Sequence, residues 1–273
     1  MSQTGEILVV GLGPGPEHWR TPEVSAALER ATDLVGYEPY LARCPERSGQ
    51  TRHGSDNRVE LERARFAIDL ARAGRIVAVV SGGDPGVFAM AAAVVEAVEV
   101  DEAARHLSVT VMPGVSAMQA AAARLGAPLG HDFCAISLSD NLKPWSLVER
   151  RLRAAADGDF VIALYNPASK ARPTRIFEAF DLLKNLKTGS TPVAFARAVG
   201  RPDERIVVTT LAEADPSIVD MATLVIIGSS ESRLIDRPGG RPWILSPRQA
   251  RGGRYEQVAP RCRPSHRQAR DRW

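Results

Sequence analysis

Short apolar runs alternate with helical patterns over the first 115 residues, and this alternation constrains the fold more than any other feature of the chain. The runs at 6–11, 33–37, 75–83 and 107–114 are rich in Val, Leu and Ile, which favours buried strands. The segments between them repeat apolar residues at helical spacing. Strands joined by helices form right-handed crossovers, so the pattern predicts an α/β fold with a parallel sheet.

The pattern changes after residue 121. Further strands are predicted at 133–140, 159–167, 191–200, 205–211 and 222–228. The last three follow one another with short connections, which antiparallel neighbours allow, so this second sheet is expected to be mixed. We therefore predict two α/β domains, at residues 1–120 and 121–235.

The C-terminal segment 236–273 is rich in Arg, Pro and Gly and has no apolar period, which is typical of a disordered tail. We expect it to be dispensable for folding. Its ten Arg and three acidic residues give it a net charge of +7, so the chain total of +3 leaves residues 1–235 at −4. This acidic body opposes a nucleic-acid partner, because phosphate binding requires a basic face.

Composition also predicts a cytoplasmic protein with no membrane span and no metal. No apolar run approaches the roughly 18 residues that a transmembrane helix needs. The N-terminus lacks the basic region of a secretory signal. Cys44, Cys134 and Cys262 are far apart, which opposes a disulfide framework or a zinc site and fits a reducing compartment.

A first glycine-rich loop, GLGPGPEHWRT (11–21), follows the first predicted strand. Its GxGxG spacing is compatible with a dinucleotide or an adenosyl group. Pro14 and Pro16 stand where a phosphate-binding helix would begin, which opposes the dinucleotide interpretation and favours a tight turn.

Two more glycine loops follow later strands. In SGGDPGVF (81–88), Gly82 and Gly83 let a ligand approach bare backbone at the carboxyl end of a parallel strand, where open sheets bind ligands. Asp84 either contacts that ligand or caps the next helix, and the two roles are compatible. In MPGVSAM (112–118), Ser116 is likewise a ligand contact or a helix cap.

Two loops of the second half combine polar and basic residues. LSDNLKPW (138–145) contains Asp140 and Lys143, and LYNPASKARP (164–173) contains Asn166. Each of these loops could equally be an ordinary turn or a capped loop. The chain has no GxSxG nucleophile motif and no metal-binding spacing of His residues.

The ordered set of glycine loops resembles the tetrapyrrole methylase family over about residues 5–235. The loops at 138–145 and 164–173 look like the branch that methylates C17 of precorrin-3B in cobalamin synthesis. The resemblance implies two α/β domains around a central cleft and S-adenosylmethionine as the cofactor. It also implies methyl transfer to C17 with ring contraction to precorrin-4, and a homodimer.

The resemblance further implies the site residues. The cofactor is expected at Pro14, Gly82, Gly83, Asp84, Val87, Ser116, Ala117, Asn166, Ala194 and Thr223, although Asn166 departs from relatives with methionine there. The carboxylate arms of the substrate are expected at Arg20, Lys143, Lys170, Arg172 and Arg175, because cationic side chains, above all guanidinium forks, suit carboxylates. The expected proton-transfer residues are His18, Asp84 and Asp140, with His131 as a further candidate.

Other functions stay open on the sequence. The substrate could be cobalt-factor III at C17, precorrin-2 at C20 or precorrin-4 at C11. A Rossmann dehydrogenase that used the first loop would need an acidic ribose ligand such as Glu38. A non-catalytic nucleotide-binding module would bind the cofactor without turnover.

Overall fold

The N-terminal half of the chain is built on a fully parallel sheet, as the sequence predicts. The computed structural model describes residues 5–56, 59–169 and 172–249. The five strands lie in the order β3-β2-β4-β1-β5, and all neighbours are parallel. Their bounds are β1 (Glu6–Gly11), β2 (Asp33–Tyr37), β3 (Thr51–Ser55), β4 (Ile76–Ser81) and β5 (Ser108–Met112). The edge strand β3 was not expected, because its sequence TRHGS contains no apolar residue.

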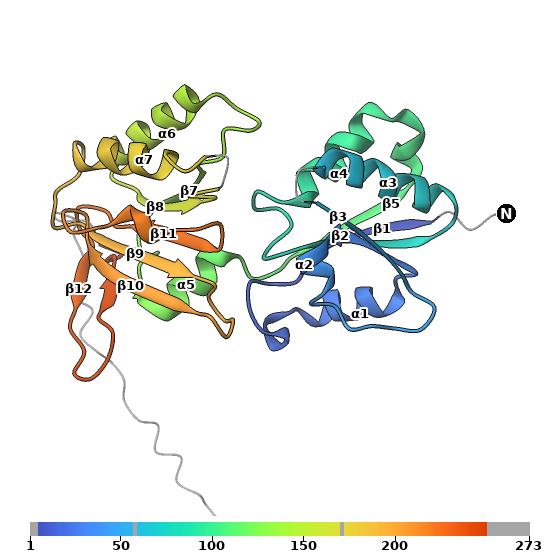
Figure 1. The fold of residues 1–273 in the computed structure, drawn as a ribbon, viewed down its shortest axis with the longest axis horizontal. Coiled ribbons are helices and arrows are strands. Elements are labelled where there is room, and N and C mark those ends of the chain that lie inside the picture. Colours follow the sequence, from blue (N-terminus) through green and yellow to red (C-terminus); the bar gives the residue numbers. More distant parts are fainter. Residues whose placement is uncertain (1–4, 57–58, 170–171, 250–273) are drawn as a thin grey trace, which may run out of the picture.

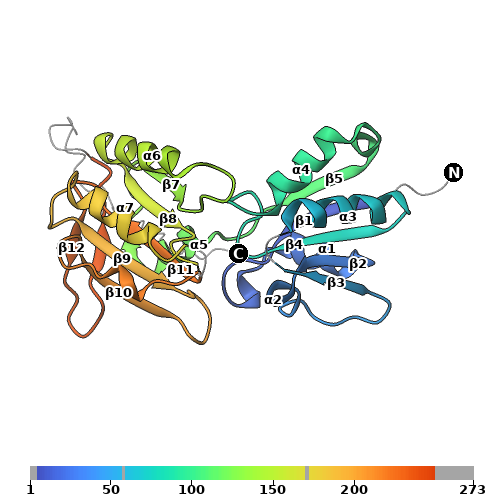
Figure 2. The same cartoon turned by 45° about the horizontal axis from the view of Figure 1, so that its top comes forward.

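Helices cover both faces of this first sheet (Figures 1 and 2). Ile7 and Val9 of β1 pack with residues of α3 and α4, whereas Leu8 and Val10 pack with residues of α1 and α2. This alternation explains why the strand is apolar at every position. The bounds are α1 (Pro22–Arg30), α2 (Glu38–Leu41), α3 (Glu60–Arg72) and α4 (Met90–Val100), with short 3-10 turns at Glu17–Trp19 and Glu102–His106.

The second half is built on a mixed sheet, which is also as predicted. Its order is β10-β9-β11-β8-β7, in which only β7 and β8 are parallel neighbours. The bounds are β7 (Phe133–Ser137), β8 (Val161–Tyr165), β9 (Pro192–Arg197), β10 (Arg205–Thr210) and β11 (Thr223–Ile227). Helices α6 (Trp145–Asp157) and α7 (Arg175–Lys184) cover one face, α5 (Ala117–Leu125) covers the other, and a 3-10 turn spans Pro216–Ile218.

The chain passes between the two halves just before α5. The buried residues of this helix, Ala120, Ala121 and Leu125, share a core with Val161 of β8 and Ile226 of β11. A boundary between residues 120 and 121 would cut this helix. We therefore propose that the second domain begins at residue 117, where α5 begins.

The prediction of a disordered tail from residue 236 is wrong for residues 236–249. A third sheet joins β12 (Arg233–Ile235), β13 (Trp243–Leu245) and β6 (Gly126–Ala127). Ile244 is 1% exposed and belongs to the core under α5. This apolar segment is short and is flanked by Pro and Gly residues, so it shows no apolar periodicity in the sequence. Residues 250–273 of the expected tail lie outside the described residues.

This third sheet predicts the effect of truncation. A chain that ends at Asp236 loses β13 and the buried Ile244, so its free energy of unfolding should fall by about 2 kcal/mol or more. A chain that ends at Gln249 keeps all of the residues that the structure describes around β13 and should unfold at the same denaturant concentration as the full chain. Equal stability of both shortened chains in urea titrations would contradict the packing role of β13.

Candidate functional site

Three glycine loops meet at the carboxyl edge of the first sheet. Strands β4, β1 and β5 are neighbours, so the loops that follow them emerge side by side. A Cβ atom on Gly114 would lie 2.4 Å from the carbonyl oxygen of Gly83, and one on Gly11 would lie 2.6 Å from the same oxygen. The N–H of Gly13 donates to that carbonyl at 3.1 Å. Glycine at residues 11 and 114 is therefore what allows the three backbones to touch.

Asp84 ties the second loop to the third. Its Oδ1 accepts from the N–H of Gly86 at 2.8 Å, and its Oδ2 accepts from the N–H of Gly114 at 3.0 Å. The alternative role as a helix cap is wrong, because α4 begins at Met90 with Ala89 as its N-cap. The carboxylate instead closes a turn and holds two loops at a fixed separation.

The space beside Gly83 is open toward the third loop. Gly83 has a φ of +70°, a conformation that glycine adopts without strain, and the nearest atoms to a Cβ there would be 3.9 Å away. Gly82, by contrast, packs directly on the ring of Tyr40. Val87 is half-buried in the same loop, and its N–H donates to the carbonyl of Asp84 at 3.3 Å.

Ser116 caps helix α5. Its hydroxyl accepts from the N–H of Gln119, whose side chain accepts in return from the N–H of Ser116. The capping role of Ser116 is therefore confirmed. Ala117 begins the helix, and its backbone nitrogen borders the open side of Gly83, as the carbonyl oxygen of Val115 does.

Tyr165 at the end of β8 reaches across to the first turn of α5, and sequence reasoning missed it. Its hydroxyl accepts from the N–H of Met118 at 3.1 Å, and its ring centroid lies 5.2 Å from that of Phe88 in the second loop. Burial raises the pKa of Tyr165, and the negative charge of Asp84 acts in the same direction. The only signal in the sequence was an aromatic residue directly before the expected contact at Asn166.

Asn166 follows Tyr165 with a φ of +51°. Asn tolerates this left-handed conformation better than most side chains. Its Nδ2 donates to the hydroxyl of Ser137 at 2.9 Å, which joins the carboxyl ends of β8 and β7. The turn at Asn166 thus lies at the same sheet edge as Tyr165.

Loops from the two halves also meet at Pro14. The Nε of Arg201 donates to the carbonyl of Pro14 at 2.9 Å. Gly15 and Gly200 pack against each other and against the ring of Trp19. Pro14 therefore lies at a contact between the first glycine loop and the turn that follows β9 in the second half.

Two more predicted cofactor residues belong to strands of the second sheet. Ala194 is fully buried in the middle of β9, where it pairs with Ile226. Thr223 lies at the edge that includes Tyr165, but its hydroxyl donates to Asp220 at 2.8 Å. Gly82, Gly83, Asp84, Ser116 and Ala117 are the predicted residues that the fold brings together.

The predicted proton-transfer residues do not form one cluster. His18 is exposed on the first loop, edge-on to Trp19. His131 precedes β7, so it lies at the edge of the second sheet opposite to Ser137 and Tyr165. Asp140 pairs with Arg175 at 2.9 Å and with Arg172 at 3.6 Å.

The predicted substrate-binding cations divide into two groups. Lys143, Arg172 and Arg175 surround Asp140, and burial, followed by the charges of Arg151 and Arg172, lowers the pKa of Lys143. Arg175 also stacks on the ring of Trp145 and pairs with Glu178. Arg20 belongs to the first loop, and Lys170 lies outside the described residues.

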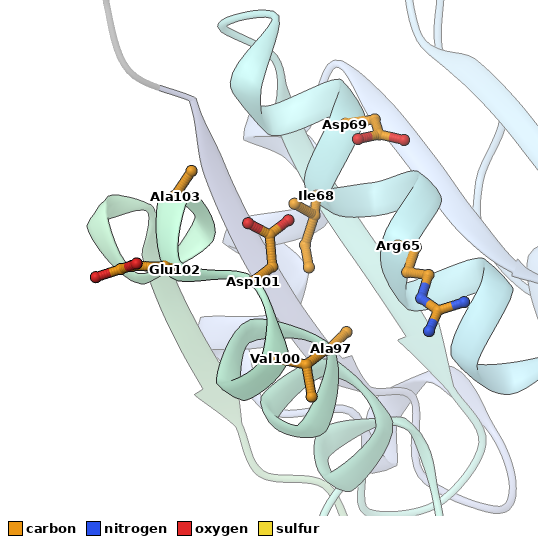
Figure 3. A pocket seen from close by; sticks show the side chains of 8 residues that line it. All are labelled: Arg65, Ile68, Asp69, Ala97, Val100, Asp101, Glu102 and Ala103. Carbon is orange, nitrogen blue, oxygen red and sulfur yellow. The ribbon is translucent and has the colours of Figure 1, made fainter.

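A separate cavity lies away from this site. A cavity of about 520 Å³ opens between α3 and the end of α4, and Figure 3 shows Asp69, Asp101 and Glu102 among its lining side chains. Helix α4 begins beyond the second glycine loop and runs back along the sheet, so its end lies away from the loops. Asp101 there is already paired with Arg72.

The loop residues fit S-adenosylmethionine. The open side of Gly83 leaves bare backbone accessible to a ligand, and the carboxylate of the next residue, Asp84, supplies negative charge beside it for a polar, cationic molecule. Among residues 5–56, 59–169 and 172–249, no group of His, Cys, Asp or Glu side chains could hold a metal ion. No helix in that same part of the chain is long and apolar enough to cross a bilayer.

A family comparison agrees with this geometry. Residues 6–215 match the family described as tetrapyrrole (corrin/porphyrin) methylases. A relative from Sinorhizobium, named precorrin-3B C(17)-methyltransferase, is 56% identical over 90% of this chain and 97% of its own length. A protein from Salmonella typhimurium, named probable cobalt-factor III C(17)-methyltransferase, is 42% identical over 84% of this chain and 95% of its own.

Solved structures give the same result. The crystal structure of the methyltransferase CobJ matches with a TM-score of 0.85 and 50% identity, over 89% of this chain and all of that one. A uroporphyrin-III C-methyltransferase from Thermus thermophilus, in complex with S-adenosylhomocysteine, matches with a TM-score of 0.65 and 26% identity. This second match covers 82% of this chain and 97% of that one.

Proposed function

Because the chain belongs to the tetrapyrrole methylase family, we propose that it transfers the methyl group of S-adenosylmethionine to C17 of precorrin-3B, with ring contraction to precorrin-4. The observation that carries this proposal is the identity of 56% to a relative of that name, over nearly the full length of both chains. The three touching glycine loops support it independently, because they leave an accessible backbone surface at the end of a parallel sheet.

We propose that the cofactor lies against the second and third loops. Gly82, Gly83 and Asp84 would contact it from one side and Ser116 and Ala117 from the other. Pro14, Val87, Asn166, Ala194 and Thr223 complete the proposed set. Since Ala194 is buried within β9, any contribution from it would come through the strand that it supports.

The bound cofactor supplies a methyl group activated by a sulfonium. Methyl transfer is an in-line displacement, so the task of the protein is to align the acceptor carbon and to exclude water. Asp84 contributes by holding the second and third loops together. Its carboxylate oxygens accept from the N–H groups of Gly86 and Gly114 at 2.8 and 3.0 Å. Tyr165 adds a hydroxyl at the first turn of α5, and burial raises the pKa of this group above its ordinary value.

Ring contraction also requires proton transfers, for which we propose Asp84 and Asp140. Arg175 and Arg172 orient the Asp140 carboxylate, and this cluster would face the carboxylate arms of the substrate together with Lys143. His18 is exposed on the first loop and remains a further candidate. The position of His131 at the opposite edge of its sheet disfavours it.

One alternative function retains support. The identity of 42% to a probable cobalt-factor III enzyme keeps the cobalt-containing substrate open as a second candidate. The dehydrogenase alternative is disfavoured, since β4 lies between β2 and β1, whereas the Rossmann order places β1 beside β2. The carboxylate of Glu38 moreover packs on Gly54 of the neighbouring strand β3.

Methyl transfer is directly testable. The purified protein should convert precorrin-3B and S-adenosylmethionine into precorrin-4 and S-adenosylhomocysteine, as followed by mass spectrometry. Parallel reactions with precorrin-2, precorrin-4 and cobalt-factor III serve as controls. Turnover of one of these in preference to precorrin-3B would contradict the proposed substrate, and cofactor binding without any turnover would favour a non-catalytic module.

We also propose a cytoplasmic homodimer with one cofactor site in each protomer. The family resemblance motivates the dimer, and the free Cys44 and Cys134 are compatible with a reducing compartment. Sedimentation equilibrium at micromolar concentration should give twice the chain mass of 29.5 kDa. A single species at the chain mass would contradict the dimer.

A further inference from the structure

Arginines from three segments converge on the first glycine loop. The Nη2 of Arg43 donates to the carbonyls of Gly13 and Gly15 at 2.8 and 2.9 Å. Arg201 belongs to the second half of the chain, and its Nε–H donates to the carbonyl oxygen of Pro14. The Nη2 of Arg20 donates to the carbonyl of Arg43 at 3.3 Å. The loop therefore brings three guanidinium groups together.

These cations lack matching negative charge. Arg20 pairs with Glu17 at 3.1 Å, but no carboxylate among the described residues forms an ion pair with Arg43 or Arg201. Asp203, which is near Arg201, bonds to Arg197 instead. Arg43 and Arg201 therefore carry two positive charges without an ion-pair partner in a partly buried place, where like charges repel one another, so an added anion would stabilise the cluster.

Several donors of the cluster are unused. The Nη1 of Arg43 and the Nε of Arg20 are buried without a hydrogen-bond partner, and the side chain of Arg20 is only 5% exposed. Arg201 is exposed, and its Nη groups donate to no residue that the structure describes. The buried donors of Arg43 and Arg20 leave their positive charge without an acceptor, which is costly, whereas the exposed Nη groups of Arg201 are the ones that an arriving acceptor can reach.

The cluster borders the cofactor loop. The ring of Tyr40 packs on Gly82, and the carbonyl of Tyr40 accepts from the N–H of Arg43 at 3.1 Å. Burial raises the pKa of the Tyr40 hydroxyl, and the charges of Arg201 and Arg43 oppose that rise. That hydroxyl makes no hydrogen bond within the described part of the chain. An anion held by Arg201 and Tyr40 would thus lie between the first loop and the residues proposed for the cofactor.

We propose that Arg201, with Tyr40 and the buried charges of Arg43 and Arg20, binds a carboxylate side arm of the tetrapyrrole substrate. This inference rests on the proposed function. A carboxylate fits because its two oxygens match the guanidinium fork. The carboxylate of the methionine part of the cofactor has the same chemistry, so the experiment must separate the two sources.

The test titrates a stable corrin polycarboxylate, cobyrinic acid, and its fully esterified form into the full-length protein with S-adenosylhomocysteine present. Arg201→Gln removes the charge but keeps an N–H for Pro14, and Arg43→Gln is the second variant. Arg47→Gln is the matched control, because Arg47 is exposed and pairs only with Glu29 among the described residues. Circular dichroism verifies that each variant is folded.

Arg201→Gln should weaken binding of the acid about tenfold or more and leave binding of the ester unchanged. Arg47→Gln should behave as the wild type. Affinity for S-adenosylhomocysteine and for methylthioadenosine, which lacks the carboxylate, should not change. A loss specific to S-adenosylhomocysteine would assign the arginines to the cofactor and overturn the proposal.

Two other results would also overturn the proposal. One is that the wild-type protein does not bind the acid more tightly than the ester, and the other is that both variants bind the acid as tightly as the wild type. The methyl-transfer assay separates this outcome from failure of the proposed function. Turnover of precorrin-3B with unchanged acid binding in the variants rejects the arginine site alone. Absence of turnover in the wild type counts against the function itself.

Discussion

The contact of three backbones at the carbonyl of Gly83 is the constraint on which the rest of the site depends. Any side chain at residues 11 or 114 would separate the loops, since a Cβ there would lie within 2.6 Å of that oxygen. The close contact places the open side of Gly83 opposite the first turn of α5. It also sets the position of the segment through which the chain enters its second half.

Charged groups at the site serve mainly to position the backbone. Asp84 uses both carboxylate oxygens to hold amides of two loops, and Arg43 holds two carbonyls of the first. Asp140 lies between two guanidinium groups. Such an arrangement suits a displacement in which alignment provides most of the rate enhancement. The cations near the first loop remain available for a substrate rich in carboxylates.

The sequence predicts the sheets and the glycine loops because both depend on local signals. β-Branched runs mark the strands, and glycine marks the positions where backbones approach. Other features depend on contacts between residues that are distant in the sequence, and local signals do not predict such contacts. Tyr165 reaches α5 across 47 positions of sequence, and Arg201 reaches Pro14 across 187. The strand β13 and the late start of α4 at Met90 were missed for the same reason, since tertiary packing decides them.

Asp84 and the glycine contacts hold the loops in the arrangement that we propose binds the cofactor. Asn at residue 84 has one acceptor oxygen, so one of two backbone amides would lose its partner, at a cost of about 1–3 kcal/mol. Calorimetric titration of S-adenosylhomocysteine should therefore show affinity about tenfold weaker or more for Asp84→Asn. Asp101→Asn, which alters a carboxylate at the distant cavity, should bind as the wild type does. Wild-type affinity in Asp84→Asn would contradict the account.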